Sequence, residues 1–348
     1  MISYGLFYFV YKYYTPDYGG RDYYHYVAIY KHPLNFKAGD APFAYRQLSA
    51  ILTNVVWRLG IYRDTKIAFA SADPRVFFAA IFANWLALVA CATVVAATSR
   101  ILVSNAGDGW SLLAGALCFF DFFAQQGVLA GLSEGVSWLL VAIGFLGWVR
   151  RSLPILATVI VLSIVQRETI PVVFGALSVF GMLLQRDAWR FHLKVLAISV
   201  IAILLYLGMR LGWPAPSNLR QLSPASFVYL IGDWPRLLTR DGLFQVFLTQ
   251  NLLIGLGVAA AVAAFATSGR TAGQRADPTV AALYLTTVAL LLVGVGALEQ
   301  SNSIGRVLSI LTPIAAPLFV KTLVSLFAPA EAAGHAENGQ AARARLQQ

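Results

Sequence analysis

The sequence has few charged residues. Asp, Glu, Lys and Arg make up 12% of its 348 residues, whereas hydrophobic residues make up 58%. A soluble domain carries about 25% charged residues, so this composition excludes a chain built from ordinary soluble domains. The repeated long apolar runs indicate an integral membrane protein with several spans. We therefore expect the net charge of +10 to meet lipid headgroups or an anionic ligand, and not nucleic acid.

The sequence patterns of common soluble active sites are also missing. The two cysteines, Cys91 and Cys118, lie in apolar runs and suggest neither a disulfide framework nor a metal site. The four histidines lack metal-ligand spacing, and there is no Walker loop, dinucleotide-binding glycine motif or nucleophile elbow. Nucleotide-driven chemistry therefore has no support. The N-terminal segment lacks a basic start and a small-residue cleavage site, so we do not expect a signal peptide.

The apolar runs predict an all-α, polytopic transmembrane helical bundle of about ten spans. A span needs about 20 residues, and several runs are shorter, so the hairpin at 153–184 is a candidate for a tilted or re-entrant pair. We expect a single transmembrane domain over residues 1–327 and a disordered tail over 328–348. The predicted spans cover residues 2–14, 76–98, 110–126, 134–149, 153–166, 170–184, 192–210, 244–267, 279–298 and 305–327.

Two long polar segments, 14–75 and 211–243, connect the predicted spans. In the first segment, tyrosines spaced by three and four residues predict a short helix over Asp22–Lys31. An apolar stripe predicts a second helix over Ala41–Leu59, with Pro42 near its start. We expect both helices to lie along the membrane interface.

Alternate connections of a ten-span bundle share a side of the membrane. One side then holds the 14–75 loop, the turns at 127–133, 166–169 and 299–305, and the 211–243 loop. The other side is more densely basic, with pairs such as Arg150–Arg151, and the positive-inside rule makes it cytoplasmic. We therefore expect a multi-pass protein of the cytoplasmic membrane whose long loops lie on the external, periplasmic side.

Three acids on the external side are candidates for chemistry. Asp17 and Asp22 follow the first span, where a carboxylate can act as general base toward a hydroxyl. The ordinary alternative is a turn acid at Asp17 and a helix-start acid at Asp22. Glu134 opens a span directly after Ser133. It is either a second acid facing the same compartment or a helix-dipole acid beside an N-cap serine.

Two further ionisable residues have open roles. Asp121 lies inside the apolar stretch CFFDFFAQQ, where a charge costs at least about 2.5–3.5 kcal/mol on insertion scales. It must therefore face protein or water, or stay protonated, and both a functional and a structural role fit. His25 lies in the first loop, where it either joins the site or is simply solvated.

Basic residues on the same side are candidates for binding a phosphate. Arg167 and Glu168 lie in the short polar turn Gln166–Thr169, as an interfacial ion pair or as a phosphate clamp that Glu168 orients. Arg306 begins the last span, and Arg46 lies in the stretch APFAYRQL. Both are further candidate phosphate partners.

These short motifs, in this order, resemble the GT-C type of polytopic glycosyltransferases, which use polyprenyl-phosphate sugars. The resembling elements are an acid in the first external loop, a PF-x-YR-x-L stretch, a small residue and acid opening a span, an RET turn, and a Gly-Arg pair opening a late span. In this chain they are Asp22, the stretch 42–48, Ser133–Glu134, Arg167–Thr169 and Gly305–Arg306. The two first-loop acids are separated here, whereas the family often has an adjacent pair, and the large soluble C-terminal domain of many members is absent from this sequence.

The resemblance implies a function as well as a fold. It implies an external active site in which a first-loop carboxylate deprotonates an acceptor hydroxyl and the sugar is transferred with inversion. The lipid phosphate would leave with its charge met by Arg or, in some members, by a divalent metal. No cofactor is assigned for this chain. The implied partners are a polyprenyl-phosphate sugar donor, an envelope glycan, lipid or protein acceptor, and membrane lipids.

A transporter or flippase for a lipid-linked or anionic substrate is the alternative function. It predicts internal repeats and charged or broken helices at mid-membrane. The sequence shows no clear repeat, and most of its ionisable residues lie at span ends, with Asp121 the main exception. A non-enzymatic scaffold is a further alternative, but it would not need acids and arginines gathered on one side.

Overall fold

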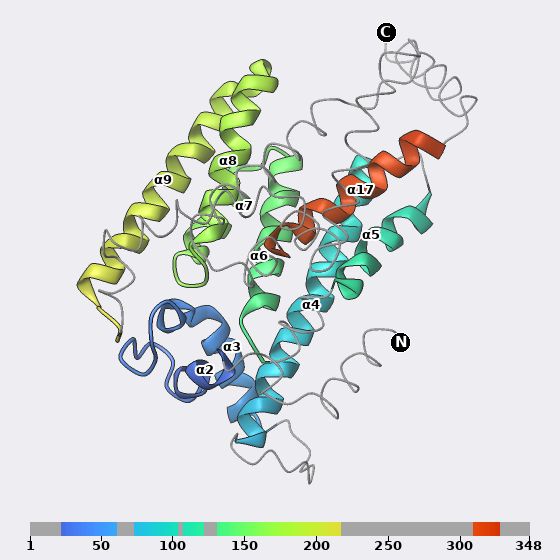
Figure 1. The fold of residues 1–348 in the computed structure, drawn as a ribbon. Coiled ribbons are helices and arrows are strands. Elements are labelled where there is room, and N and C mark those ends of the chain that lie inside the picture. Colours follow the sequence, from blue (N-terminus) through green and yellow to red (C-terminus); the bar gives the residue numbers. More distant parts are fainter. Residues whose placement is uncertain (1–21, 61–72, 104–106, 122–130, 217–308, 328–348) are drawn as a thin grey trace, which may run out of the picture.

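The computed structural model describes residues 22–60, 73–103, 107–121, 131–216 and 309–327 of the chain (Figure 1). All secondary structure within these ranges is helical, which confirms the predicted all-α class. The α-helices are α2 (Asp22–Lys31), α3 (Gln47–Arg58), α4 (Pro74–Leu102), α5 (Asp108–Phe120), α6 (Glu134–Val149), α7 (Leu153–Ser163), α8 (Thr169–Leu184), α9 (Trp189–Gly212) and α17 (Thr312–Phe327). Short 3-10 helices are η2 (Phe43–Tyr45), η4 (Arg186–Ala188) and η6 (Ser309–Leu311).

Seven of the predicted spans have a described helix, and two of these helices are long and apolar enough to cross a membrane. These two are α4 and α9, with 29 and 24 residues. The other apolar helices among the described residues have 10–17 residues, short of the roughly 20 that a straight span needs. The predicted spans at 2–14, 244–267 and 279–298 lie outside the described residues, so the count of ten stays a prediction.

Helix α6 is the centre of the bundle. It packs against α4, α7 and α17, and α8 pairs with α9 beside it (Figure 1). Most α6 side chains are buried, from Glu134 to Trp148. A helix buried on most of its circumference is expected to be apolar all round, and the sequence EGVSWLLVAIGFLGWV meets this condition except at its first turn. Polar residues at that first turn are therefore the exception that needs a reason.

The described part of the first polar segment folds into a small unit at one end of the bundle, beside the start of α4 and the end of α9 (Figure 1). Helix α2 matches the predicted range, and Tyr23, Tyr26 and Tyr30 are buried as their spacing predicted. The predicted helix over Ala41–Leu59 was too long. Only 47–58 is α-helical, because the backbone leaves helical geometry at Arg46, with φ −90° and ψ 55°.

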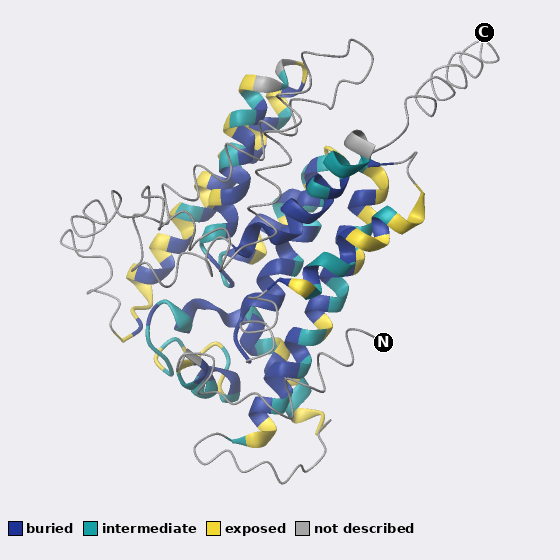
Figure 2. Ribbon diagram, turned by 45° about the vertical axis from the view of Figure 1, so that its right-hand side comes forward, coloured by how far each residue is buried: buried dark blue, intermediate teal, exposed yellow. Residues whose placement is uncertain are grey.

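The apolar stripe of α3 faces outward. Leu52 and Val55 are 40% and 50% exposed, whereas the polar side chains of the helix, Gln47, Ser49, Thr53 and Asn54, are buried. Asn54 Nδ2 donates to the carbonyl of Tyr30 at 2.7 Å, so the polar face has partners inside the protein. Figure 2 shows that exposed residues lie on the outer helices while the middle of the bundle is buried. An exposed apolar stripe fits the predicted position along a membrane interface.

Asp73 joins α2 to the start of α4. Its carboxylate accepts a hydrogen bond from the backbone N–H of Arg75 at 3.1 Å, as an N-cap does, and lies 2.9 Å from Lys31 Nζ. Partial burial acts to raise the pKa of Asp73, but the hydrogen bonds from Lys31 and Arg75 outweigh it, so that the pKa lies below its ordinary value. The ion pair thereby fixes the first polar segment to the first long helix.

Candidate functional site

Four segments far apart in the sequence meet next to the α2–α3 unit. They are the start of α4, the segment 131–135 that leads into α6, the turn between α7 and α8, and the end of α9 (Figure 1). The turn is joined to α3 by a backbone hydrogen bond from Leu48 N to the carbonyl of Val165 at 3.0 Å. The end of α9 is joined to the unit by a backbone bond from Ala41 N to the carbonyl of Pro216 at 3.0 Å.

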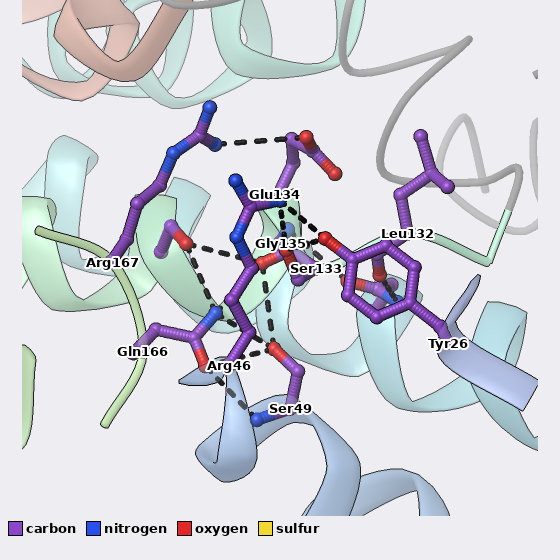
Figure 3. A network of polar contacts seen from close by, with 11 residues as sticks. Tyr26, Arg46, Ser49, Leu132, Ser133, Glu134, Gly135, Gln166 and Arg167 are labelled. Carbon is purple, nitrogen blue, oxygen red and sulfur yellow. Dashed lines mark hydrogen bonds and ion pairs between the residues drawn. The ribbon is translucent and has the colours of Figure 1, made fainter. Parts of the chain in front are cut away.

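Arg46 is buried in this region, with 7% of its surface exposed. Its guanidinium donates to the hydroxyl of Tyr26 and to Ser133 Oγ, the latter at 3.3 Å (Figure 3). It also lies over the ring of Phe43, 5.4 Å from the ring centroid. The break between η2 and α3 therefore places a charged side chain inside the protein, where its charge acts more strongly than in water.

Glu134 and Arg167 form a second buried charged group. Arg167 Nη1 lies 3.6 Å from Glu134 Oε1, and the side chains are 4% and 0% exposed (Figure 3). Removing two charges from water costs several kcal/mol per ion before their attraction offsets it, so such a pair is weak evidence for a stabilising role. Ionisable groups buried among apolar helices are instead typical of functional sites.

Gln166 joins the elements around these charges. Its Nε2, which carries two hydrogens, lies 2.7 Å from Ser49 Oγ, 2.9 Å from the carbonyl oxygen of Ser133 and 3.0 Å from Ser137 Oγ. Its Oε1 accepts from both the N–H and the hydroxyl of Ser49 at 3.0 Å (Figure 3). One amide thus connects α3, the segment before α6, α6 itself and the α7–α8 turn.

Ser133 occupies the N-cap position of α6 that one interpretation of Ser133–Glu134 predicted, but its side chain does not cap the helix. It makes no capping bond, and its hydroxyl lies 3.0 Å from that of Tyr26. Asn84 of α4 instead supplies hydrogen-bond partners for the backbone at the start of α6. Its Oδ1 accepts from Gly135 N at 3.1 Å, and its Nδ2 donates to the carbonyl of Leu132. The serine is therefore left to bond with Tyr26 and Arg46.

Tyr30 holds the start of the same segment. Its hydroxyl donates to the carbonyl of Gly131 at 2.8 Å. Burial raises the pKa of Tyr30 well above its ordinary value, so the hydroxyl stays protonated and remains a donor. Together with Asn84, it fixes the backbone that carries Ser133 and Glu134.

A further arginine lies at the end of α9. Arg210 is buried, with its guanidinium 5.5 Å and 5.7 Å from the ring centroids of Tyr45 and Tyr206. The carboxyl of Glu168 lies near the Tyr206 hydroxyl, so the acid predicted beside Arg167 faces the α9 side of the region. Arg210 was not among the predicted site residues, because its position near the end of an apolar run resembles an ordinary interfacial arginine.

His25 lies at the exposed edge of the same unit. Its Nδ1 is 3.3 Å from Asp40 Oδ2, and 42% of each side chain is exposed. Its ring stacks on Phe43 with a centroid distance of 4.9 Å and an interplanar angle of 7°. His25 is therefore not merely solvated, because it contacts both Asp40 and Phe43.

The predicted span 110–126 would place Asp121 inside a helix, but the structure places it just after one. Helix α5 ends at Phe120, and the buried carboxylate of Asp121 accepts a hydrogen bond from Thr312 Oγ1 at 2.8 Å. Thr312 is the first residue of α17, where an acid also complements the helix dipole. This contact supports the structural interpretation of Asp121.

Three predicted site residues remain. Asp17 and Arg306 lie outside the described residues, and for Asp22 the backbone is described as the first residue of α2 but its side chain is not. The structure thus brings together Arg46, Glu134 and Arg167, with Glu168 and His25 at the edges. The network residues Tyr26, Ser49 and Gln166 were not predicted as such, because hydroxyls and amides carry no sequence signal of their distant partners.

The arrangement suits the binding of an anion. Three buried guanidinium groups and two carboxylates meet around one end of the bundle, and arginine is the usual partner of phosphate. Across the described ranges, no group of three or more His, Cys, Asp or Glu side chains is placed to hold a metal ion. No family model, curated protein or solved structure matches the chain.

Proposed function

We propose that the chain is an integral-membrane glycosyltransferase. It transfers a sugar from a polyprenyl-phosphate donor to an envelope glycan, lipid or protein acceptor, on the external face of the cytoplasmic membrane. The proposal includes the ten-span bundle and places the α2–α3 unit outside. The resemblance to GT-C enzymes motivates the proposal.

The observation that carries the proposal is the buried group of Arg46, Arg167 and Glu134 at one end of a bundle that contains two candidate spans. A lipid-linked donor has its tail in hydrocarbon and its sugar phosphate in water, so donor and acceptor meet at the end of the spans. Arginines buried at that level are suited to a phosphate group.

In the proposed reaction, the acceptor oxygen attacks the anomeric carbon of the donor and loses its proton to a basic group. The bond between that carbon and the phosphate oxygen breaks, and its electron pair leaves with the lipid phosphate. Arg46 and Arg167 stabilise the charge that develops on the leaving phosphate. Glu134 orients Arg167. By the resemblance, the proton acceptor is a carboxylate of the first external segment, and Asp17 and Asp22 are the candidates.

The described residues do not support a metal site, because they contain no suitable group of ligands. In the proposed reaction, guanidinium groups meet the charge of the leaving phosphate.

The proposal is tested with the full chain in lipid nanodiscs and a panel of polyprenyl-phosphate sugars. The wild-type protein is expected to transfer at least one sugar to an acceptor extract. Arg167→Lys keeps the charge but loses the planar fork, and is expected to lower the rate at least about 100-fold. Arg151→Lys is the matched control, because Arg151 is an exposed arginine paired with Asp187, and it is expected to stay within about twofold of wild type.

Binding of polyprenyl phosphate separates a site effect from a folding defect. Arg167→Lys is expected to elute as the wild type does on size exclusion and to bind the lipid phosphate more weakly. Equal rates for both variants and the wild type would contradict the proposal. Movement of a lipid-linked sugar across the bilayer, with no transfer to any acceptor, would favour the transporter alternative.

A further inference from the structure

The edge of the α2–α3 unit carries an oriented histidine that the resemblance does not assign. His25 lies on α2, and Asp40 lies in the segment that leads into η2, fifteen residues later. The Nδ1–Oδ2 distance of 3.3 Å brings a carboxylate to one ring nitrogen of the histidine. Since 42% of the histidine side chain is exposed, the ring remains accessible from outside the protein.

Close packing of the 39–41 segment on α2 places the Asp40 carboxylate beside His25. A Cβ added at Gly39 would lie 2.5 Å from Ile29 Cδ1 and 3.0 Å from the carbonyl oxygen of His25. Glycine therefore permits an approach that any larger residue would oppose. Ala41, on the other side of Asp40 in the sequence, is held by a hydrogen bond from its N–H to the carbonyl of Pro216. Asp40 is thus fixed between α2 and the chain that follows α9.

Phe43 connects this pair to the arginine group. The imidazole of His25 stacks on the Phe43 ring, and the guanidinium of Arg46 lies over the same ring at 5.4 Å. The ring of Tyr26, whose hydroxyl accepts from Arg46, meets Phe43 edge-on at 5.2 Å. The histidine and the proposed phosphate-binding arginine are therefore separated by a single aromatic ring.

This geometry defines which nitrogen can act as a base. A carboxylate at Nδ1 favours the tautomer in which Nδ1 carries the proton, so the lone pair is on Nε2. In hydrolytic triads an acid beside Nδ1 likewise holds the imidazole in the tautomer whose Nε2 can take a proton. An exposed, oriented imidazole beside an anion site has what a general base needs.

We propose that His25, oriented by Asp40, is the general base of the transfer reaction, in place of a lone first-loop carboxylate. This proposal rests on the proposed glycosyltransferase function. The acceptor hydroxyl gives its proton to Nε2 of His25 as its oxygen forms the bond to the anomeric carbon. The bond to the phosphate oxygen breaks at the same time, and the phosphate leaves with the electron pair toward Arg46. The proton is then released from the imidazolium to water.

The test is chemical rescue of His25→Ala in the nanodisc assay. The substitution is expected to lower the transfer rate at least about 100-fold, as loss of a general base does, while binding of polyprenyl phosphate stays unchanged. Added imidazole is expected to restore part of the rate. Pyrazole, which has nearly the same shape but is far less basic, is expected to restore none. Asp40→Asn is expected to lower the rate less than His25→Ala does.

His32→Ala is the matched control, because His32 is an exposed histidine of the same segment, and its rate is expected to stay within about twofold of wild type. Full activity of His25→Ala would overturn the proposal, as would equal rescue by imidazole and pyrazole or a loss that no added base restores. If Asp22→Asn abolishes transfer while His25→Ala retains it, the carboxylate is the base and the glycosyltransferase proposal stands. Inactivity of the wild-type protein with every donor would instead reject the proposed function itself.

Discussion

Gln166 is the residue whose loss the site should tolerate least. Its amide lies within hydrogen-bonding distance of Ser49, Ser133 and Ser137, and all of these contacts are buried. Gln166→Leu keeps the approximate volume but leaves these groups without the amide. An unsatisfied buried polar group costs about 1–3 kcal/mol, so we expect a loss of about 3 kcal/mol or more in the free energy of unfolding. Unfolding of the purified protein in mixed micelles measures this loss.

Gln185→Leu is the control for this prediction. Gln185 is half-buried at the opposite end of the bundle, and among the described residues its side chain bonds to His192, at 3.1 Å. We expect it to cost about 1 kcal/mol, in line with a single hydrogen bond. Equal losses of stability for the two variants would contradict this prediction. They would show that the additional contacts of Gln166 add nothing to the free energy of unfolding.

At the scale of single residues, the sequence predicted the charged residues of the site better than the residues of its hydrogen-bond network. Arg46, Glu134 and Arg167 were predicted as site residues because each lies in a short polar motif on the side predicted to be external. Gln166 was noted only as part of a polar turn, and Arg210 was not singled out. Their roles depend on Ser49, Tyr45 and Tyr206, which reach them only through the tertiary fold.

Among the elements, α4 and the start of α6 approach each other closely at the site. A Cβ added at Gly135 would lie 2.7 Å from the backbone oxygen of Asn84 and 2.9 Å from its Oδ1. The backbone oxygen cannot rotate away, so Gly135→Ala must push the two helices apart, at a cost of about 1–3 kcal/mol. We also expect weaker binding of polyprenyl phosphate, because Glu134 would move relative to Arg167. Thermal unfolding and a lipid-phosphate binding assay measure the two effects.

Gly109→Ala is the matched control, since Gly109 is likewise the second residue of its helix, α5, and a Cβ there would meet nothing within 4 Å. We expect it to leave binding unchanged and stability equal or slightly higher, because alanine is the better helix former. A destabilisation as large as that of Gly135→Ala would refute the steric explanation.

Helix α3 shows where element prediction succeeded and where it failed. The apolar stripe correctly indicated a helix, but its start was placed six residues early, because the stretch before Gln47 forms η2 and a break at Arg46. Periodicity also does not tell which face is inside. In α3 the polar face packs inward, where Asn54 and Ser49 bond to neighbouring backbone and side chains, and the apolar face is exposed.

At the scale of the whole molecule, polar groups are divided between the two ends of the bundle. The arginine group and the His25–Asp40 pair lie at the end with the α2–α3 unit, whereas Arg151 and Asp187 form an exposed ion pair beyond the other ends of α6 and α8. The alternation of membrane sides proposed from the sequence stays a prediction. Composition sufficed for the all-α class, but helix lengths did not follow from it, because α5 and α7 end before their apolar runs do.

The proposed orientation predicts which end a membrane-impermeant maleimide can reach. Both native cysteines are buried, so introduced cysteines can be read against a low background. Lys37→Cys places a thiol at an exposed position of the α2–α3 unit, and Asp187→Cys places one at the opposite end, where the Asp187 side chain is 71% exposed. In right-side-out vesicles we expect labelling at position 37 alone, and in inverted vesicles at position 187 alone. The reverse pattern would put the arginine group on the cytoplasmic side and exclude an external transferase. Labelling of both positions from one side would show that α4 and α9 do not carry the chain across the bilayer, because their ends could then not face different compartments.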